Sequence, residues 1–288
     1  MACLKMITIN ATIEAILIGI YSDNLLSNSL FLKGGQALRF KEKLTNRFSA
    51  DADFSTPSSI DNVDIFFEAL YSALALVFRD RGYYLFAFKY TKRPNKLKDG
   101  SPDFWSGWGV EFKIIEESKR NLPLDVINRE ALIPEGASSP KITLDISEYE
   151  YCGSVERVKI AHGVEINSYS RALLILEKIR AICQQHITYP HRNSDQRARD
   201  YYDIERLWNK ALQEEADSHL FIQELKTHIR SVFEAKDVDI EILQRIFDSE
   251  FIEIQRTGWP QIESTVKGKI QDFDYYVETL RGIINLVL

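Results

Sequence analysis

Residues 30–54 read LFLKGGQALRFKEKLTNRFSADADF, and the pattern of this stretch decides the fold. A short apolar run leads into Gly34-Gly35, where consecutive glycines allow a tight backbone turn. The spacing after the turn predicts a helix over residues 36–44, and a second strand is expected over residues 50–54. The order strand, glycine turn, helix and strand indicates a domain that mixes both kinds of element.

The flanking sequence extends this mixed pattern and then changes. Apolar spacing predicts helices over 12–27 and 63–78, an aromatic-rich strand over 83–90, and alternating strands around 110–114 and 142–146. From residue 170 onward the pattern is helical, over 173–183, 201–212, 221–233, 240–247 and 273–288. We therefore predict an α+β protein with a mixed β-sheet domain over residues 1–168, flanked by helices, and a helical C-terminal domain over residues 169–288.

Composition excludes several classes of protein. The 288 residues are 45% hydrophobic and 27% charged, which is typical of globular proteins. No apolar run reaches the roughly 18–20 residues of a membrane span, and the first 20 residues do not resemble a signal peptide, so a cytoplasmic protein is expected. Three widely spaced cysteines neither frame a disulfide scaffold nor form a zinc motif.

The charge balance limits how nucleic acid could be bound. With 42 acidic and 36 basic residues the net charge is -6, so any RNA contact depends on a local patch. Basic residues gather in two places, Lys89, Lys92, Arg93, Lys96 and Lys98 in the first and Arg39, Lys41, Lys43 and Arg47 in the second. These side chains could contact an RNA backbone, although such runs are often simply solvated.

The glycine turn and the two aspartates after it suggest phosphate and metal chemistry. Backbone amides at the start of a helix attract anions such as phosphates, although Gly-Gly turns are also common without a ligand. Asp51 and Asp53 lie two apart on the predicted strand and would project from one face. Two carboxylates so close together are stabilised by a hard divalent cation such as Mg²⁺, and the alternative is a solvated acidic turn.

A third carboxylate could come from either of two other strands. Asp145 alternates with apolar residues and points to the polar side of its strand, as Glu111 does on another. If the strand at 142–146 is a neighbour of residues 50–54, Asp145 joins the two aspartates, and we favour it over Glu111.

Taken together, four motifs resemble those of a known family. They are Gly34-Gly35-x-x-Leu38, Arg47-x-Ser49-x-Asp51-x-Asp53, Glu177-Lys178 and Arg199-Asp200-Tyr201-Tyr202-Asp203. In this order they resemble the motifs of AbiEii-type nucleotidyltransferase toxins, which belong to the DNA polymerase β-like superfamily and act in bacterial toxin–antitoxin and phage-defence pairs. The motifs span residues 33–203, well over half of the chain.

The resemblance implies a reaction and a set of site residues. It implies Mg²⁺-dependent transfer of a nucleoside monophosphate from an NTP to an RNA acceptor such as the 3′ end of tRNA, and a cognate antitoxin encoded nearby. The implied metal ligands are Asp51, Asp53 and Asp145, and the implied catalytic residues are these three with Lys178 and Asp200. The implied nucleotide-binding residues are Lys33, Gly34, Gly35, Gln36, Arg47, Ser49 and Lys178.

Three alternatives remain open at this stage. Lys178 could be a solvated helix lysine, and Asp200 could simply favour a helix start, where acidic residues interact well with the helix dipole. Gln36 stands where the superfamily usually has Ser or Thr, which raises the alternative of a nucleotide-binding or RNA-binding module without turnover. Transfer to a small molecule instead of RNA is the third alternative.

Overall fold

A computed structural model describes the chain except for residues 1–6, 45–50, 95–101, 193–194, 215–217 and 267. Two of the predicted site residues, Arg47 and Ser49, fall outside the described residues. The chain divides into two compact units, the first comprising residues 1–37, 49–149 and 157–168, and the second residues 38–48, 150–156 and 169–288. We call them the sheet unit and the helical unit and describe each by itself.

The sheet unit is built on a mixed sheet in the order β3-β4-β5-β2-β1-β7-β6. The strands are β1 (Phe31–Lys33), β2 (Ala52–Ser55), β3 (Tyr83–Arg93), β4 (Gly107–Glu116), β5 (Ile142–Ser147), β6 (Val155–Lys159) and β7 (Glu165–Tyr169). β2 runs parallel to β5, and β1 runs parallel to β7, whereas β1–β2, β3–β4 and β4–β5 are antiparallel. The two segments that carry the predicted carboxylates, β2 and β5, are therefore neighbours.

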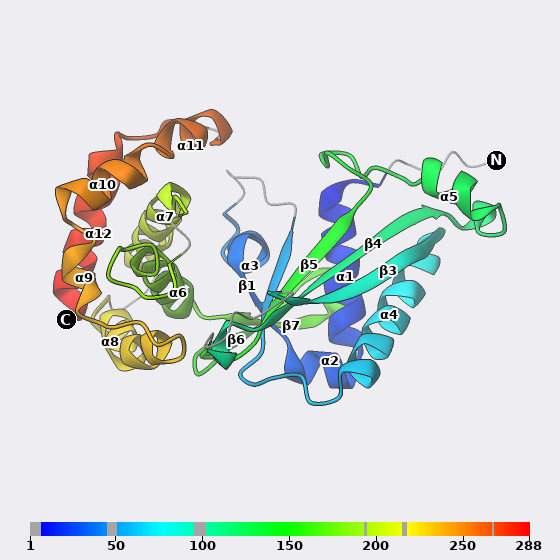
Figure 1. The fold of residues 1–288 in the computed structure, drawn as a ribbon, viewed down its shortest axis with the longest axis horizontal. Helices are drawn as coiled ribbons and strands as arrows, with labels where there is room; N and C mark the ends of the chain where they lie inside the picture. Colours follow the sequence, from blue (N-terminus) through cyan, green and yellow to red (C-terminus); the bar gives the residue numbers. More distant parts are fainter. Residues whose placement is uncertain (1–6, 45–50, 95–101, 193–194, 215–217, 267) are drawn as a thin grey trace. The chain divides into compact units, whose positions relative to one another are not determined.

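One face of this sheet is apolar and covered by helices. Leu144 of β5 lies opposite Ala52 on one side and Val110 on the other, and all three are buried. Helices α1 (Ile9–Ser22), α2 (Asn24–Ser29) and α4 (Val63–Arg79) lie together alongside the strands (Figure 1). Phe78 of α4 packs edge-on against Phe112 of β4, with ring centroids 5.6 Å apart. Because side chains alternate along a strand, the polar residues between these apolar ones face the other way.

A smaller apolar cluster lies where β3 begins and the antiparallel β4 ends. The short helix α5 (Leu124–Arg129) contributes Ile127, which packs with Phe86 and Ile115.

The helical unit is organised around α6, whose side chains are buried along most of its length. Its helices are α6 (Arg171–Cys183), α7 (Ala198–Glu214), α8 (Ser218–Glu234), α9 (Ile242–Arg245), α10 (Ser249–Arg256), α11 (Trp259–Thr265) and α12 (Phe273–Val287). α7 and α8 pack directly on α6, and α12 packs on α7 and α8 (Figure 1). None of the described helices in either unit is long and apolar enough to cross a membrane.

The predicted elements are present with shifted ends and one division. The helix expected over residues 12–27 is split at Asp23, whose carboxylate accepts a hydrogen bond from the Leu26 N–H at 3.0 Å and starts α2. β6, β7, α5, α10 and α11 were not predicted. Trp259-Pro260 begins α11, where proline is well suited to the first helical turn.

Candidate active site

The glycine turn places its backbone directly against one of the predicted aspartates. β1 ends at Lys33 and α3 (Gly34–Phe40) follows without an intervening loop. Gly34 has a φ of +61°, and a Cβ at this position would overlap the carboxylate of Asp53. Only glycine meets both conditions, because it lacks a Cβ and adopts positive φ at low cost. The turn and Asp53 therefore form one local unit.

A row of in-register residues crosses the sheet beside this turn. Asp53 of β2 lies opposite Lys33 of β1 on one side and opposite Asp145 of β5 on the other. Residues directly opposite on neighbouring strands project from the same face, so these three side chains share the polar face of the sheet. The buried Lys33 donates from Nζ to Ser147 Oγ at 3.1 Å. We call these three in-register residues, Lys33, Asp53 and Asp145, the acidic row, after its two aspartates.

Asp51 lies one residue before β2 begins and is exposed. The Thr143 hydroxyl donates to Asp51 Oδ1 at 2.5 Å. Thr143 and Asp145 are two apart on β5 and therefore project from the same face. Asp51 thus lies beside the acidic row, on the same polar face as the other two aspartates.

The protonation of Asp145 is perturbed by its surroundings. Burial raises the pKa of Asp145, the charge of Asp51 raises it further, and the opposing charges of Arg93 and Lys33 offset only part of this. Arg93, at the end of β3, donates to Asp145 Oδ1 at 2.5 Å, and its guanidinium lies over Gly109 of β4. Arg93 was expected only as part of a basic patch, so its contact with this carboxylate was missed by sequence reasoning.

Glu111, the rival for the third carboxylate, is placed differently. It lies on β4 opposite Thr143, so β5 separates it from the strand that carries Asp53. Its carboxylate accepts a hydrogen bond from Lys141 Nζ at 2.8 Å, and this contact holds the pKa of Glu111 below its usual range. Asp145 is therefore the closer neighbour of Asp53.

Gln36, the departure from the superfamily pattern, is fully buried. Its amide nitrogen donates to the backbone carbonyl of Asp51 at 3.2 Å. This contact fixes the backbone where the two aspartates enter β2. We could not foresee this role from the sequence, which suggested only that the amide replaces a hydroxyl near phosphates.

In the helical unit, the structure brings together Lys178, Asp200 and Asp203. Lys178 of α6 is 5% exposed, and its Nζ lies 2.9 Å from Asp200 Oδ1 and 2.9 Å from Asp203 Oδ2 on α7. A solvated Lys178 is therefore excluded. Arg197 Nη1 lies 3.9 Å from Asp200 Oδ2, and Arg199 is exposed. Both carboxylates of the Arg199–Asp203 motif therefore contact the buried ammonium group of Lys178.

The described members of the two basic patches form contacts within the protein. Lys92 Nζ lies 2.5 Å from the buried carboxylate of Glu148, and Lys41 Nζ lies 2.6 Å from Glu42. Lys96, Lys98 and Arg47 fall outside the described residues. An RNA contact through Lys41, Lys92 or Arg93 would require that residue to exchange a carboxylate for a phosphate, whereas Lys43 and Lys89 are exposed.

The carboxylate oxygens of Asp51, Asp53 and Asp145 are ligands of the type that binds a hard cation. Asp53 and Asp145 lie in register, Asp51 lies beside them, and burial together with the charge of Asp51 raises the pKa of Asp145. Oxygen ligands of this kind are those that Mg²⁺ prefers. Within the described ranges, however, no three His, Cys, Asp or Glu side chains are already grouped around a metal position. Asp51 and Asp145 would bind a cation by turning from Thr143 and Arg93.

Comparison with known proteins identifies a family. Residues 15–279 match the family model described as "Nucleotidyl transferase AbiEii toxin, Type IV TA system". The chain is similar to the crystal structure of JHP933 from Helicobacter pylori, with 15% identity, a TM-score of 0.43, and coverage of 96% of this chain and 89% of that one. It is also similar to an antigenic nucleotidyltransferase-like protein from Paracoccidioides brasiliensis, with 13% identity, a TM-score of 0.38, and coverage of 82% and 96%. No curated protein matches it.

Proposed function

The chain belongs to the AbiEii nucleotidyl transferase toxin family of type IV toxin–antitoxin systems, and on this premise we propose that it moves a nucleoside monophosphate from an NTP to an RNA acceptor, the 3′ end of tRNA. Membership makes it a nucleotidyltransferase with an NTP as substrate and a cognate antitoxin as partner. Both proposed substrates imply that it acts in the cytoplasm, and blocked tRNA would halt translation during phage infection.

The observation that carries the proposal is the acidic row beside the Gly34 turn. Asp53 lies against the turn, Asp145 lies opposite Asp53, and Asp51 adjoins both. Transfer of a nucleotidyl group requires neutralisation of the triphosphate and an activated acceptor hydroxyl. We assign Asp51, Asp53 and Asp145 to a Mg²⁺ ion, which would neutralise the phosphates when bound.

The remaining residues receive roles that follow from their chemistry. Lys33, Gly34 and Gly35 would bind the triphosphate through an ammonium group and backbone amides, with Arg47 and Ser49 as further contacts. Asp145 has an alternative role to metal binding, in which it accepts the proton of the attacking hydroxyl as a general base. Lys178 and Asp200 stay catalytic candidates on the basis of the family motifs alone. Gln36 positions Asp51 rather than contacting phosphate.

The direct test is transfer of radiolabel in vitro. The full chain is incubated with each labelled NTP, Mg²⁺ and total RNA, and the labelled RNA is separated on a gel. We expect label on tRNA with at least one NTP and none in the presence of a chelator. Absence of label with all four NTPs would overturn the enzymatic assignment.

A growth assay separates an enzyme from a module that only binds nucleotide or RNA. We expect expression of the wild-type chain to arrest growth and Asp51→Asn to abolish the arrest, because a metal ligand is lost while the fold is retained. A non-catalytic binder would arrest growth equally with either chain. Glu111→Gln, on β4, is the matched control and is expected to arrest growth as the wild type does.

A further inference from the structure

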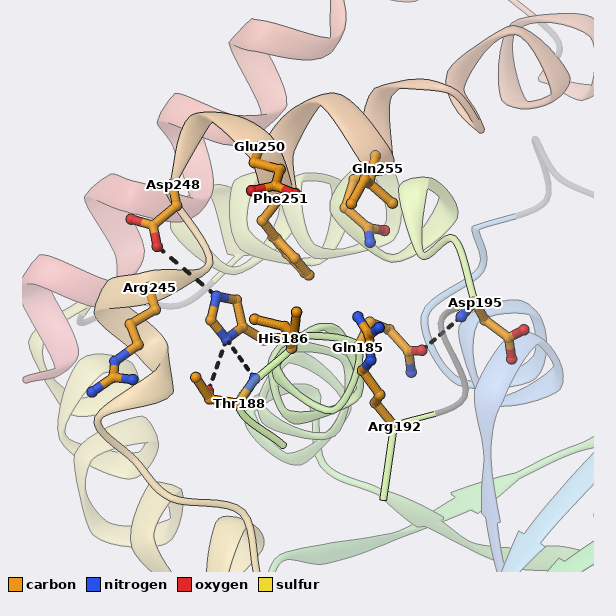
Figure 2. A pocket seen from close by; sticks show the side chains of 12 residues that line it. Gln185, His186, Thr188, Arg192, Asp195, Arg245, Asp248, Glu250, Phe251 and Gln255 are labelled. Atoms are coloured by element: carbon orange, nitrogen blue, oxygen red, sulfur yellow. Dashed lines mark hydrogen bonds and ion pairs between the residues drawn. The ribbon is translucent and has the colours of Figure 1, made fainter. Parts of the chain in front are cut away.

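A pocket is lined only by residues of the helical unit. Its volume is about 670 Å³, and its lining residues come from the segment after α6 and from α9 and α10 with the turn between them (Figure 2). The residues that line it do not include Lys178, Asp200 or Asp203. The volume lies in the range of about 300–1,000 Å³ that is typical of small-molecule sites. The proposed transfer reaction leaves this pocket without a role.

The floor of the pocket is formed by a buried glutamine, whose side-chain amide has a fixed orientation. Gln255 is 1% exposed, and its Oε1 accepts a hydrogen bond from the Arg197 N–H at 2.6 Å. Because only the oxygen of an amide can accept, this contact fixes which end of the group is the nitrogen. Figure 2 shows the Gln255 amide directed into the pocket, and among the described residues its Nε2 makes no hydrogen bond. Gln255 therefore presents a donor of fixed orientation to the pocket.

His186 supplies a second donor and part of an aromatic wall. Its Nδ1 accepts from the Thr188 N–H at 3.3 Å, so the neutral ring carries its proton on Nε2. Burial lowers the pKa of His186, and although Asp248 opposes this from 3.9 Å, Arg245 and Arg192 lower it further. The ring is thus a neutral donor at neutral pH. Phe251 packs beside it, with ring centroids 5.3 Å apart.

The rim of the pocket carries mixed charges. Two arginines, Arg192 and Arg245, and three carboxylates, Asp195, Asp248 and Glu250, are all exposed there. Three acids against two bases repel a triphosphate, which carries several negative charges. Carboxylates do accept hydrogen bonds from sugar hydroxyls, and one guanidinium group can bind a single phosphate.

We propose that this pocket binds a nucleoside unit, with the base against His186 and Phe251 and the ribose at the carboxylate rim. Bases carry carbonyl and ring-nitrogen acceptors, which match the donors of Gln255 and His186, and they stack on aromatic side chains. The unit is a free nucleoside, its monophosphate or an unpaired nucleotide of an RNA, since all three share this chemistry. The inference goes beyond the transfer reaction and does not depend on it.

Calorimetric titration of the full chain tests the proposal. The probes are the four nucleosides, their 5′-monophosphates and triphosphates, and a short single-stranded RNA. We expect saturable binding of at least one nucleoside or monophosphate, or of the RNA. Because the proposed transfer site would itself bind an NTP, the triphosphates are titrated into Asp53→Asn, where we expect no gain over the monophosphates. Nucleosides and monophosphates are expected to bind Asp53→Asn as they bind the wild type, so that failure of the transfer reaction and failure of this site are told apart.

Two pairs of variants locate the binding. Gln255→Glu keeps the acceptor for the Arg197 N–H and replaces the donor with an oxygen, so affinity should fall by about tenfold or more. Gln244→Glu makes the same change at an exposed position of α9 that does not line the pocket. Ile254→Trp obstructs the pocket from a partly exposed position and should also weaken binding, whereas Leu220→Trp on α8 should not.

Each outcome of these titrations either supports or overturns the proposed nucleoside site. Binding of free nucleosides that Gln255→Glu weakens supports a small-molecule site, and binding of RNA alone with the same dependence supports an RNA site. The proposal is overturned if no probe binds in the millimolar range. It is equally overturned if Gln255→Glu and Ile254→Trp, shown to be folded by circular dichroism, bind as well as their controls.

Discussion

The acidic residues of the sheet unit and those of the helical unit have opposite surroundings. Asp51 is exposed, and Asp145 is partly exposed with a pKa raised by burial and by the charge of Asp51. Asp200 and Asp203 are 7% and 3% exposed, and each lies 2.9 Å from Lys178. The first group is accessible to a ligand and holds like charges close together, with Arg93 in contact with Asp145, whereas the second group is buried around a shared lysine.

The charged residues of the two units therefore affect the protein in different ways. Like charges held together on an accessible face cost stability unless a cation or ligand binds between them. A buried lysine between two carboxylates holds two helices together, and loss of the lysine would leave buried charges uncompensated. We therefore propose metal chemistry for the sheet unit, and a structural role for the Lys178 cluster besides the catalytic role that the family motifs suggest for Lys178.

The largest effect should come from removal of the buried cation. We expect Lys178→Met to lower the free energy of unfolding by about 3–5 kcal/mol, because Asp200 and Asp203 lose the cation between them. Denaturation in urea measures this change. Combining Lys178→Met with Asp200→Asn and Asp203→Asn should recover most of the stability without recovering transfer. A single variant as stable as the wild type would show that the cluster is not structural.

A smaller effect is expected at the glycine turn. Gly34→Ala should cost about 1–2 kcal/mol for the left-handed backbone and more for the overlap with the Asp53 carboxylate, and it should reduce transfer. Gly163→Ala is the matched control, because Gly163 has a φ of +73° but nothing lies within 4 Å of the added Cβ. Both variants should therefore lose stability, but only Gly34→Ala should lose activity. If Gly34→Ala and Gly163→Ala were equally active, the Gly34 turn would not be part of the active site.

The smallest effect should be a gain of stability at Asp145. A carboxyl whose pKa is raised by folding destabilises the folded state at pH values above that pKa and stops doing so as the pH falls through it. Asp145→Asn should therefore stabilise the protein at neutral pH, by less than about 1 kcal/mol because the side chain is partly solvated. The difference from the wild type should disappear in acid, whereas transfer should be lost at every pH. Thermal melts across pH check this, and a loss of stability would contradict it.

Much of the fold was predictable because it follows from apolar periodicity. The alternation in β5 and the glycine turn after β1 were both visible in the sequence. β6 was missed because its residues are mostly exposed and give no alternation, and the short polar helix α10 was missed for a similar reason. The break at Asp23 depends on a side-chain cap within a continuous apolar pattern.

The site was only partly predictable, because the spacing of residues along the chain does not specify the order of the strands in the sheet. The sequence placed Asp51 and Asp53 together, but only the pairing of β2 with β5 puts Asp145 beside them and removes Glu111. The contact of Arg93 with Asp145 joins strands that are not neighbours in the sheet. Likewise, the spacing of Asp200 and Asp203 shows one helix face but not the lysine on α6 that this face meets.

The central claim, that the aspartates beside the Gly34 turn hold a divalent cation together with an NTP, is tested most directly by metal binding. Titration of Mn²⁺ in the presence of a non-hydrolysable NTP, followed by electron paramagnetic resonance, counts bound ions without relying on turnover. We expect wild type and Glu111→Gln to bind equally, and Asp53→Asn to bind about tenfold or more weakly. Equal binding by all three proteins would contradict the assignment.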